Sequence, residues 1–252
     1  MPTSRTNDKS CSNCGASLRS VARFCASCGR RWNDRPAESA PTSQEGRVAL
    51  GIGVLFLGTL AAVVLGAFIA RRWNGTLDFL YVGLHAALML LVGALGCLIL
   101  GFRSWRKSLG SWPAARWLAI APVAGAVAAA LAMLYARMLA SAGHGGAPSE
   151  AIMTPATVLL VVIVAPLLEE WIDRGVLWVA CLRAGDERIA LLVTSGLFAI
   201  SHGLNGGYML EIPHRFVGGL VLGWLRWRSG SLVTPIIAHV TWNVLAIWSA
   251  SA

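Results

Sequence analysis

Long apolar runs separated by short polar segments fill the chain from residue 47 onward. Each run is close to the roughly 20 residues that an α-helix needs to cross a lipid bilayer. The runs are 48–70, 79–102, 116–140, 156–182, 188–205, 212–227 and 231–249. We count seven crossings, although the sixth run is short and rich in glycine, so six or eight also fit. The pattern predicts an all-α polytopic membrane protein with about seven transmembrane helices.

The first 46 residues lack apolar runs and divide by composition. Residues 1–31 hold four of the six cysteines. Residues 32–46 are rich in Pro, Ser, Ala and Glu, a composition typical of a linker. We therefore expect a small cysteine-rich unit at 1–31, a flexible linker at 32–46 and a membrane domain at 47–252.

The composition agrees with a chain that lies mostly in lipid. Hydrophobic residues make up 56% of the 252 positions and charged residues 13%, whereas a soluble domain carries about 25% charged residues. The net charge of +9 could indicate nucleic-acid binding, but the basic residues lie mainly between the apolar runs, where they set membrane orientation. We expect the lipid bilayer as a partner and no nucleic acid.

Basic residues gather in two segments that indicate the orientation. Residues 1–47 carry eight basic and four acidic residues, whereas Glu150 is the one charged residue of the third loop. The basic residues of the second loop are Arg103, Arg106, Lys107 and Arg116. Because strongly basic loops stay in the cytoplasm, we expect a cytoplasmic amino terminus and a carboxyl terminus on the outer side.

The four cysteines near the start form the pattern CxxC-x10-CxxC. They are Cys11, Cys14, Cys25 and Cys28. Each pair can hold one side of a tetrahedral Zn²⁺, and the glycines that follow, Gly15 and Gly29, permit the tight turns that such sites use. Two disulfides are the alternative, which a reducing cytoplasm disfavours. Four thiolates leave no open coordination position, so the zinc would be structural.

The segment CSNCGASLRSVARFCASCG resembles the short zinc ribbons found at the start of many bacterial membrane proteins. The resemblance implies a bacterial inner-membrane protein. It also implies that the ribbon could recruit a cytosolic protein partner.

Polar residues within three of the apolar runs are expected at a similar depth. Glu169, His202 and His239 lie in the fourth, fifth and seventh runs. With a rise of 1.5 Å per residue, they come roughly 21, 21 and 17 Å from the arginines that flank their runs. Ionisable groups at this depth normally face the interior of the helix bundle and each other.

Spacing within each run suggests how these side chains are presented. Glu170 and Arg174 are four residues apart and can pair on one helix face, which leaves Glu169 free on the neighbouring face. Phe198 precedes His202 by one turn and can pack on its ring. His239 and Asn243 are also four residues apart, so they can address one substrate atom together. These residues could equally form structural hydrogen bonds and a buried ion pair.

Three motifs of these runs match one known family. EEWIDR fits EExxxR, FAISH fits FxxxH and HVTWN fits HxxxN, in this order and on separate runs. Residues 150–249 resemble the CPBP (CAAX protease and bacteriocin-processing, or Abi) family of intramembrane proteases, which is related to the type II CAAX prenyl endopeptidase. Asp173 is an unexpected charge within the first motif and could compete with Glu170 for Arg174.

The resemblance implies hydrolysis of a peptide bond in a membrane-associated protein or peptide. Glu169 would activate a water molecule with help from His202, and His239 with Asn243 would stabilise the oxyanion. Glu170 and Arg174 would hold the fourth helix in register. No metal is then expected at this site.

Three alternatives remain open at the level of sequence. A His₂Glu set of Glu169, His202 and His239 could bind a catalytic zinc ion, as in soluble metalloproteases. The same residues could move protons or a small solute in a transporter. The chain could also be an inactive scaffold that recruits partners through its ribbon.

Overall fold

The computed structural model describes two parts of the chain separately. The described residues are 9–10, 17–18, 43–72, 79–101, 108–144, 154–206 and 209–251. The chain divides into two compact units, Met1–Thr42 and Ser43–Ala252. In the first unit, β1 (Lys9–Ser10) pairs in antiparallel fashion with β2 (Ser17–Leu18). The four cysteines predicted to bind zinc lie outside the described residues.

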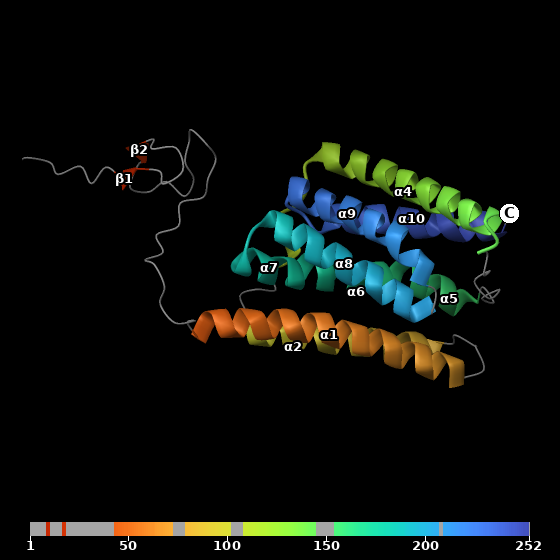
Figure 1. Ribbon diagram of the computed structural model, residues 1–252, viewed down its shortest axis with the longest axis horizontal. Coiled ribbons are helices and arrows are strands. Elements are labelled where there is room, and N and C mark those ends of the chain that lie inside the picture. Colours follow the sequence, from red (N-terminus) through yellow and green to blue (C-terminus); the bar gives the residue numbers. More distant parts are fainter. Residues whose placement is uncertain are drawn as a thin grey trace, which may run out of the picture. The chain divides into compact units, whose positions relative to one another are not determined.

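Helices make up the second unit, and their positions confirm the predicted all-α membrane fold (Figure 1). The uninterrupted helices are α1 (Ser43–Arg72), α2 (Phe79–Leu100), α4 (Ala115–Ser141), α8 (Glu187–Gly206), α9 (Ile212–Ser229) and α10 (Val233–Ser251). The predicted fourth run is helical from Pro155 to Ala184. Helix α1 begins inside the segment expected to be a linker, with Glu45 in its first turn. An acidic residue there favours helix initiation, because it faces the positive end of the helix dipole.

Three segments among the described residues have the length and apolar composition of membrane-crossing helices. They are Glu45–Gly66, Val82–Leu100 and Ala115–Ser141. Val233–Ser249 is a shorter apolar helix. The other predicted crossings are also helices, but they contain charged or glycine-rich stretches. They supply the polar residues described below.

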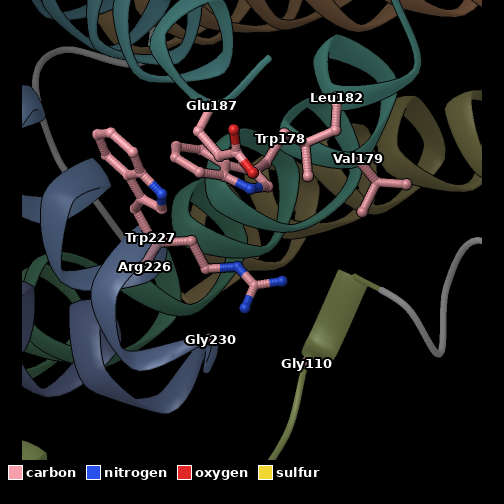
Figure 2. A pocket seen from close by; sticks show the side chains of 8 residues that line it. All are labelled: Gly110, Trp178, Val179, Leu182, Glu187, Arg226, Trp227 and Gly230. Atoms are coloured by element: carbon pink, nitrogen blue, oxygen red, sulfur yellow. The ribbon is translucent and has the colours of Figure 1, made fainter. Parts of the chain in front are cut away.

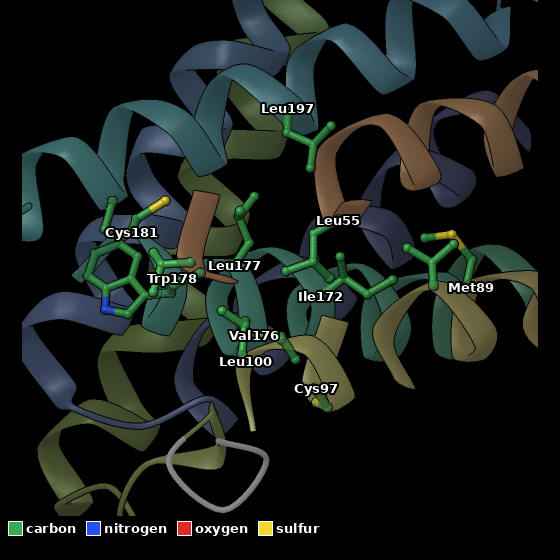
Figure 3. Close-up of a cluster of buried hydrophobic side chains, with 14 of the residues drawn as sticks. Leu55, Met89, Cys97, Leu100, Ile172, Val176, Leu177, Trp178, Cys181 and Leu197 are labelled. Atoms are coloured by element: carbon green, nitrogen blue, oxygen red, sulfur yellow. The ribbon is translucent and has the colours of Figure 1, made fainter. Parts of the chain in front are cut away.

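Two large hydrophobic cores and a smaller cluster of Val82, Ala156 and Leu160 hold the described helices together. The first core joins α1 and α2 to the fourth run and α8, through Leu55, Met89, Ile172 and Leu197 (Figure 3). Cys97 and Cys181 are free, buried members of this core. The second core joins α4, α8, α9 and α10, and its members include Trp117, Phe198, Leu222 and Trp242. Arg174 of the fourth run contacts the second core, because its guanidinium lies 4.8 Å from the centre of the Phe198 ring.

Glycines allow close contact between α9 and α8. A Cβ atom on Gly219 would lie 3.0 Å from Ser195 Cα, and one on Gly223 would lie 2.6 Å from a methyl group of Leu191. The GxxxG pair of α9 therefore serves packing within the bundle.

The spacing arguments assumed that the fourth run is a regular α-helix, and this assumption is wrong. Two π-helical segments interrupt it. Its parts are α5 (Pro155–Leu159), η1 (Leu160–Val164), α6 (Ala165–Glu170), η2 (Trp171–Leu177) and α7 (Trp178–Ala184). The two glutamates of the first motif end the short α6 segment, between the two π-helical segments. Such π-segments frequently occur at functional sites.

Candidate active site

Glu170 and Arg174 form a buried ion pair, as their four-residue spacing predicts. Arg174 Nη1 lies 3.1 Å from Glu170 Oε1, and neither side chain is exposed. The same nitrogen lies 3.4 Å from Asp173 Oδ2, so Asp173 shares the guanidinium with Glu170. Arg174 also donates from Nη2 to the carbonyl of Gly219 over 3.0 Å. The arginine thus ties the first motif to α9.

Glu170 has a second partner, which the sequence did not reveal. His239 Nδ1 lies 2.9 Å from Glu170 Oε1. A carboxylate oxygen accepts hydrogen bonds, so Nδ1 carries the donated proton. This bond fixes the ring of His239 and leaves Nε2 to face Glu169.

The ring of His202 is fixed by its own helix. Its Nδ1 lies 2.8 Å from the carbonyl oxygen of Phe198, one turn earlier. Because a carbonyl only accepts, Nδ1 is the protonated nitrogen in the neutral ring. The Phe198 ring lies 4.4 Å from the His202 ring, centroid to centroid, and forms the expected wall. Nε2 of His202 therefore also faces Glu169 as an acceptor.

Glu169 lies between the two histidines. Its Oε2 is 4.0 Å from His202 Nε2 and 3.9 Å from His239 Nε2. The structure thus brings together the three residues that the depth calculation placed at one level. The Glu169 side chain is 20% exposed, whereas Glu170 is fully buried. Of the two glutamates, Glu169 is the one that an incoming molecule can reach.

Asn243 has a partner in the fourth run that its spacing from His239 did not reveal. Its Nδ2 donates to the carbonyl oxygen of Val161 over 2.8 Å. The N–H of Ala165 donates to Leu160, five residues earlier, and Pro166 has no N–H. Val161 therefore lacks the helical donors of those two positions, and Asn243 replaces them. An amide nitrogen has two hydrogens, so one remains for another acceptor.

Several buried polar atoms of the site lack a hydrogen-bond partner within the described part of the chain. They are Glu169 Oε2, Glu170 Oε2, Asp173 Oδ1 and Arg174 Nε. Buried polar atoms in native proteins are nearly always satisfied by protein groups or by ordered water. Their concentration around Glu169 indicates a hydrated site within an otherwise apolar bundle.

Two arginines of α9 lie in this region, although neither was predicted from the sequence to be a site residue. Arg215 stacks over the ring of Trp242 at 5.5 Å and pairs with Glu211 at 3.2 Å. Its four-residue spacing from Glu211 was the available signal. Arg226 donates from Nε to the backbone carbonyl of Arg174 over 2.8 Å. Spacing along one apolar run cannot reveal this bond, because its acceptor is a backbone atom of a distant run.

The distances between Glu169 and the two histidines are longer than those between ligand atoms of a zinc site. Zinc with nitrogen or oxygen ligands at about 2.0–2.1 Å in a tetrahedron keeps those ligand atoms about 3.3 Å apart. The distances from Glu169 Oε2 to the two histidine nitrogens, 4.0 and 3.9 Å, are longer. Among the described residues, no group of three or more His, Cys, Asp or Glu side chains is arranged to hold a metal. The spacing suits one water oxygen that makes two hydrogen bonds of about 2.8–3.0 Å better than one zinc ion.

Comparisons with known proteins agree with this description. Residues 151–245 match the family model of the Rce1-like type II CAAX prenyl endopeptidases, and residues 10–31 match a zinc-ribbon domain. An Escherichia coli protein described as "Uncharacterized 24.3 kDa protein" is 28% identical over 160 residues, which cover 52% of this chain and 70% of that protein. No solved structure matches the chain.

These matches confirm the family suggested by the three motifs. They support intramembrane protease activity of the CAAX type and a structural zinc ion in the ribbon. The chain is an integral membrane protein in which residues 10–31 match a zinc-ribbon domain and residues 151–245 match the Rce1-like type II CAAX prenyl endopeptidases.

Proposed function

We propose that this protein is an intramembrane endopeptidase that uses Glu169 to activate water. The observation that carries the proposal is the position of Glu169 Oε2, unpartnered among the described residues and 3.9–4.0 Å from two histidine nitrogens. One water molecule can bridge Glu169 and His202 by hydrogen bonds. Both groups can therefore act on the same nucleophile.

In the proposed reaction, Glu169 takes a proton from this water while the water oxygen attacks the scissile carbonyl carbon. The carbonyl oxygen becomes an oxyanion, and the proton passes from Glu169 to the leaving nitrogen as the C–N bond breaks. His202 accepts a hydrogen bond from the water through Nε2, because its Nδ1 proton is held by Phe198. Atoms and charge balance without a further reactant.

His239 and Asn243 are proposed to stabilise the oxyanion. Asn243 can donate its second amide hydrogen while the first stays on Val161. His239 already donates from Nδ1 to Glu170, so donation from Nε2 requires a second ring proton. The carboxylate of Glu170 is placed to balance that added charge. Preorganised donors of this kind often contribute the largest share of catalysis in acyl transfer.

The substrate is proposed to be a membrane-associated protein or peptide. Family analogy offers a peptide precursor, the membrane-anchoring tail of a protein, or a prenylated carboxyl terminus. The bacterial character of the ribbon makes the prenylated substrate the least attractive of these. We also propose a bacterial inner-membrane location with a cytoplasmic ribbon, which would hold structural zinc and could bind a cytosolic partner.

A peptide-library assay tests the proposed function. Purified protein in liposomes is incubated with membrane-associated peptides, and new peptide termini are identified by mass spectrometry. Wild-type protein should generate new termini, and a folded Glu169→Ala variant should not. A transporter or a scaffold would yield no new termini with either protein, which would refute the proposal.

A further inference from the structure

The second π-helical segment of the fourth run ends in the same way as the first. In η2 the N–H of Trp178 donates to Asp173, five residues earlier. A regular α-helix would direct that N–H to the carbonyl of Arg174 instead. Arg174 O accepts from Arg226 Nε over 2.8 Å, just as Val161 O accepts from Asn243 over 2.8 Å. Each π-segment is thus closed by a side chain from one of the last two helices.

Arg226 is held firmly where it makes this bond. Its side chain is buried and donates from Nη2 to the carbonyl of Ser108 over 3.2 Å. Figure 2 shows its guanidinium extending from α9 into a cavity of about 380 Å³ beside Trp178, near Gly110 and Gly230. A Cβ atom on Gly110 would lie 2.5 Å from Arg226 Nη1, and the positive φ of 73° at Gly110 suits glycine. The guanidinium therefore has little freedom to move.

The residue whose backbone Arg226 holds carries the central ion pair of the site. Arg174 binds Glu170 Oε1 at 3.1 Å, and the same oxygen accepts from His239 at 2.9 Å. A shift of the backbone at Arg174 would therefore move the ring of His239 through the Arg174–Glu170 ion pair and the Glu170–His239 hydrogen bond. Misplacement of reacting groups by about 1 Å can cost on the order of a hundredfold in rate.

We propose that Arg226 is a positioning residue for the hydrolytic site. It closes the second π-segment and thereby sets Arg174, Glu170 and the ring of His239. The kinetic part of this proposal rests on the proposed function, whereas the structural part does not. Arg226 need not touch substrate or water for this role.

The chain offers a matched control on the same helix. Arg228 lies two residues after Arg226 and is exposed. Loss of either arginine removes one positive charge from the last turn of α9. Only the loss of Arg226 removes the bond to Arg174. A difference between the two variants therefore reports on the buried hydrogen bonds of Arg226, to Arg174 and to Ser108, rather than on charge.

The first measurement is steady-state cleavage of an identified peptide by the full-length protein in liposomes. Arg226→Gln should lower kcat by about ten- to a hundredfold, with KM changed less than about twofold, because substrate binding surfaces are untouched. Arg226→Lys should recover part of kcat, since an ammonium can donate to one carbonyl. Arg228→Gln should match wild type.

The second measurement does not depend on activity. Side-chain ¹⁵N resonances of His239 are recorded in protein with labelled histidine and assigned with a His239→Gln variant. Arg226→Gln and Arg226→Lys should shift the His239 signals, and Arg228→Gln should not. Should Arg226→Gln fail to fold, Arg226→Lys provides the same comparison with Arg228→Gln.

Two results would overturn the role of Arg226. One is a His239 spectrum that is the same in Arg226 and Arg228 variants. The other is equal kcat for these variants in a protein that does cleave peptide. If wild-type protein cleaves nothing, the proposed function fails, but the His239 spectra still decide whether Arg226 positions the site.

Discussion

His239 donates from Nδ1 to Glu170 Oε1 over 2.9 Å, which joins residues that lie 69 positions apart in the chain. Glu170 is fully buried and His239 is 1% exposed, so solvent does not compete for this bond. The geometry resembles the carboxylate–imidazole pairs that orient histidines in hydrolytic enzymes. The second glutamate of the EExxxR motif therefore has a task beyond pairing with Arg174.

Glu170→Gln should reduce kcat by about 10²- to 10⁴-fold, because an uncharged amide cannot balance a second proton on His239. The change also weakens a buried ion pair, so the thermal unfolding midpoint in detergent should fall. Cleavage rate and unfolding are measured on the same preparation. Glu187→Gln, at an exposed glutamate in the first turn of α8, is the control; it should leave kcat unchanged and lower the unfolding midpoint much less than Glu170→Gln does. An unchanged kcat in folded Glu170→Gln protein would remove Glu170 from the catalytic arrangement.

Asn243 gives a prediction with two separable parts. Asn243→Ala leaves the carbonyl of Val161 without its side-chain donor and should destabilise the protein by about 1–3 kcal/mol. If the second amide hydrogen stabilises the oxyanion, kcat should also fall by about 10²- to 10³-fold. Thermal unfolding and single-turnover cleavage measure the two effects.

The control for Asn243 lies on the same helix. The Thr241 hydroxyl donates to the carbonyl of Ile237 in its own helix over 2.8 Å, and Thr241→Val should leave kcat near wild type. Reduced stability of Asn243→Ala with an unchanged kcat would show that Asn243 only closes the first π-segment.

The sequence predicted the positions of the helices well and the internal form of the fourth run poorly. Apolar runs of about 20 residues bound each helix because hydrocarbon solvates only such segments. The proximity of Glu169, His202 and His239 followed from helical rise alone. The π-segments did not, because they depend on which N–H groups are redirected and on donors from distant helices.

Side-chain pairs within one helix were also predictable, whereas pairs between helices were not. Glu170 with Arg174 and Phe198 with His202 follow from four-residue spacing. The bonds of His239 to Glu170 and of Asn243 to Val161 depend on how α10 packs against the fourth run. The sequence consequently predicted the helix that carries Asn243 but not the hydrogen bond of Asn243 to Val161.

Membrane orientation can be tested by reporter fusion. Because both basic segments should lie in the cytoplasm, a reporter fused before residue 1 should report a cytoplasmic location. A reporter fused after Ala252 should report the outer side. If both ends lie on one side, one of the predicted crossings is wrong, and the short α9 is the first to re-examine.

The zinc ribbon should be independent of the membrane domain. Purified full-length protein should contain about one zinc ion per chain, and the double change Cys11→Ser and Cys14→Ser should abolish it. Elemental analysis measures the zinc, and thermal unfolding reports on the membrane domain. Cys97→Ala, in the first hydrophobic core, should keep the zinc. Unfolding of the membrane domain in the double variant would show that the two units depend on each other.

The central claim is that Glu169 activates water without a metal. It is tested most directly by the rate of peptide cleavage in a strong chelator by protein that lacks residues 1–46, with Glu169 or Glu169→Gln. The account predicts that the Glu169 protein cleaves without stoichiometric metal and that folded Glu169→Gln protein has no turnover. Activity that disappears with the chelator and returns with one bound zinc per chain, or turnover by Glu169→Gln, would contradict the account.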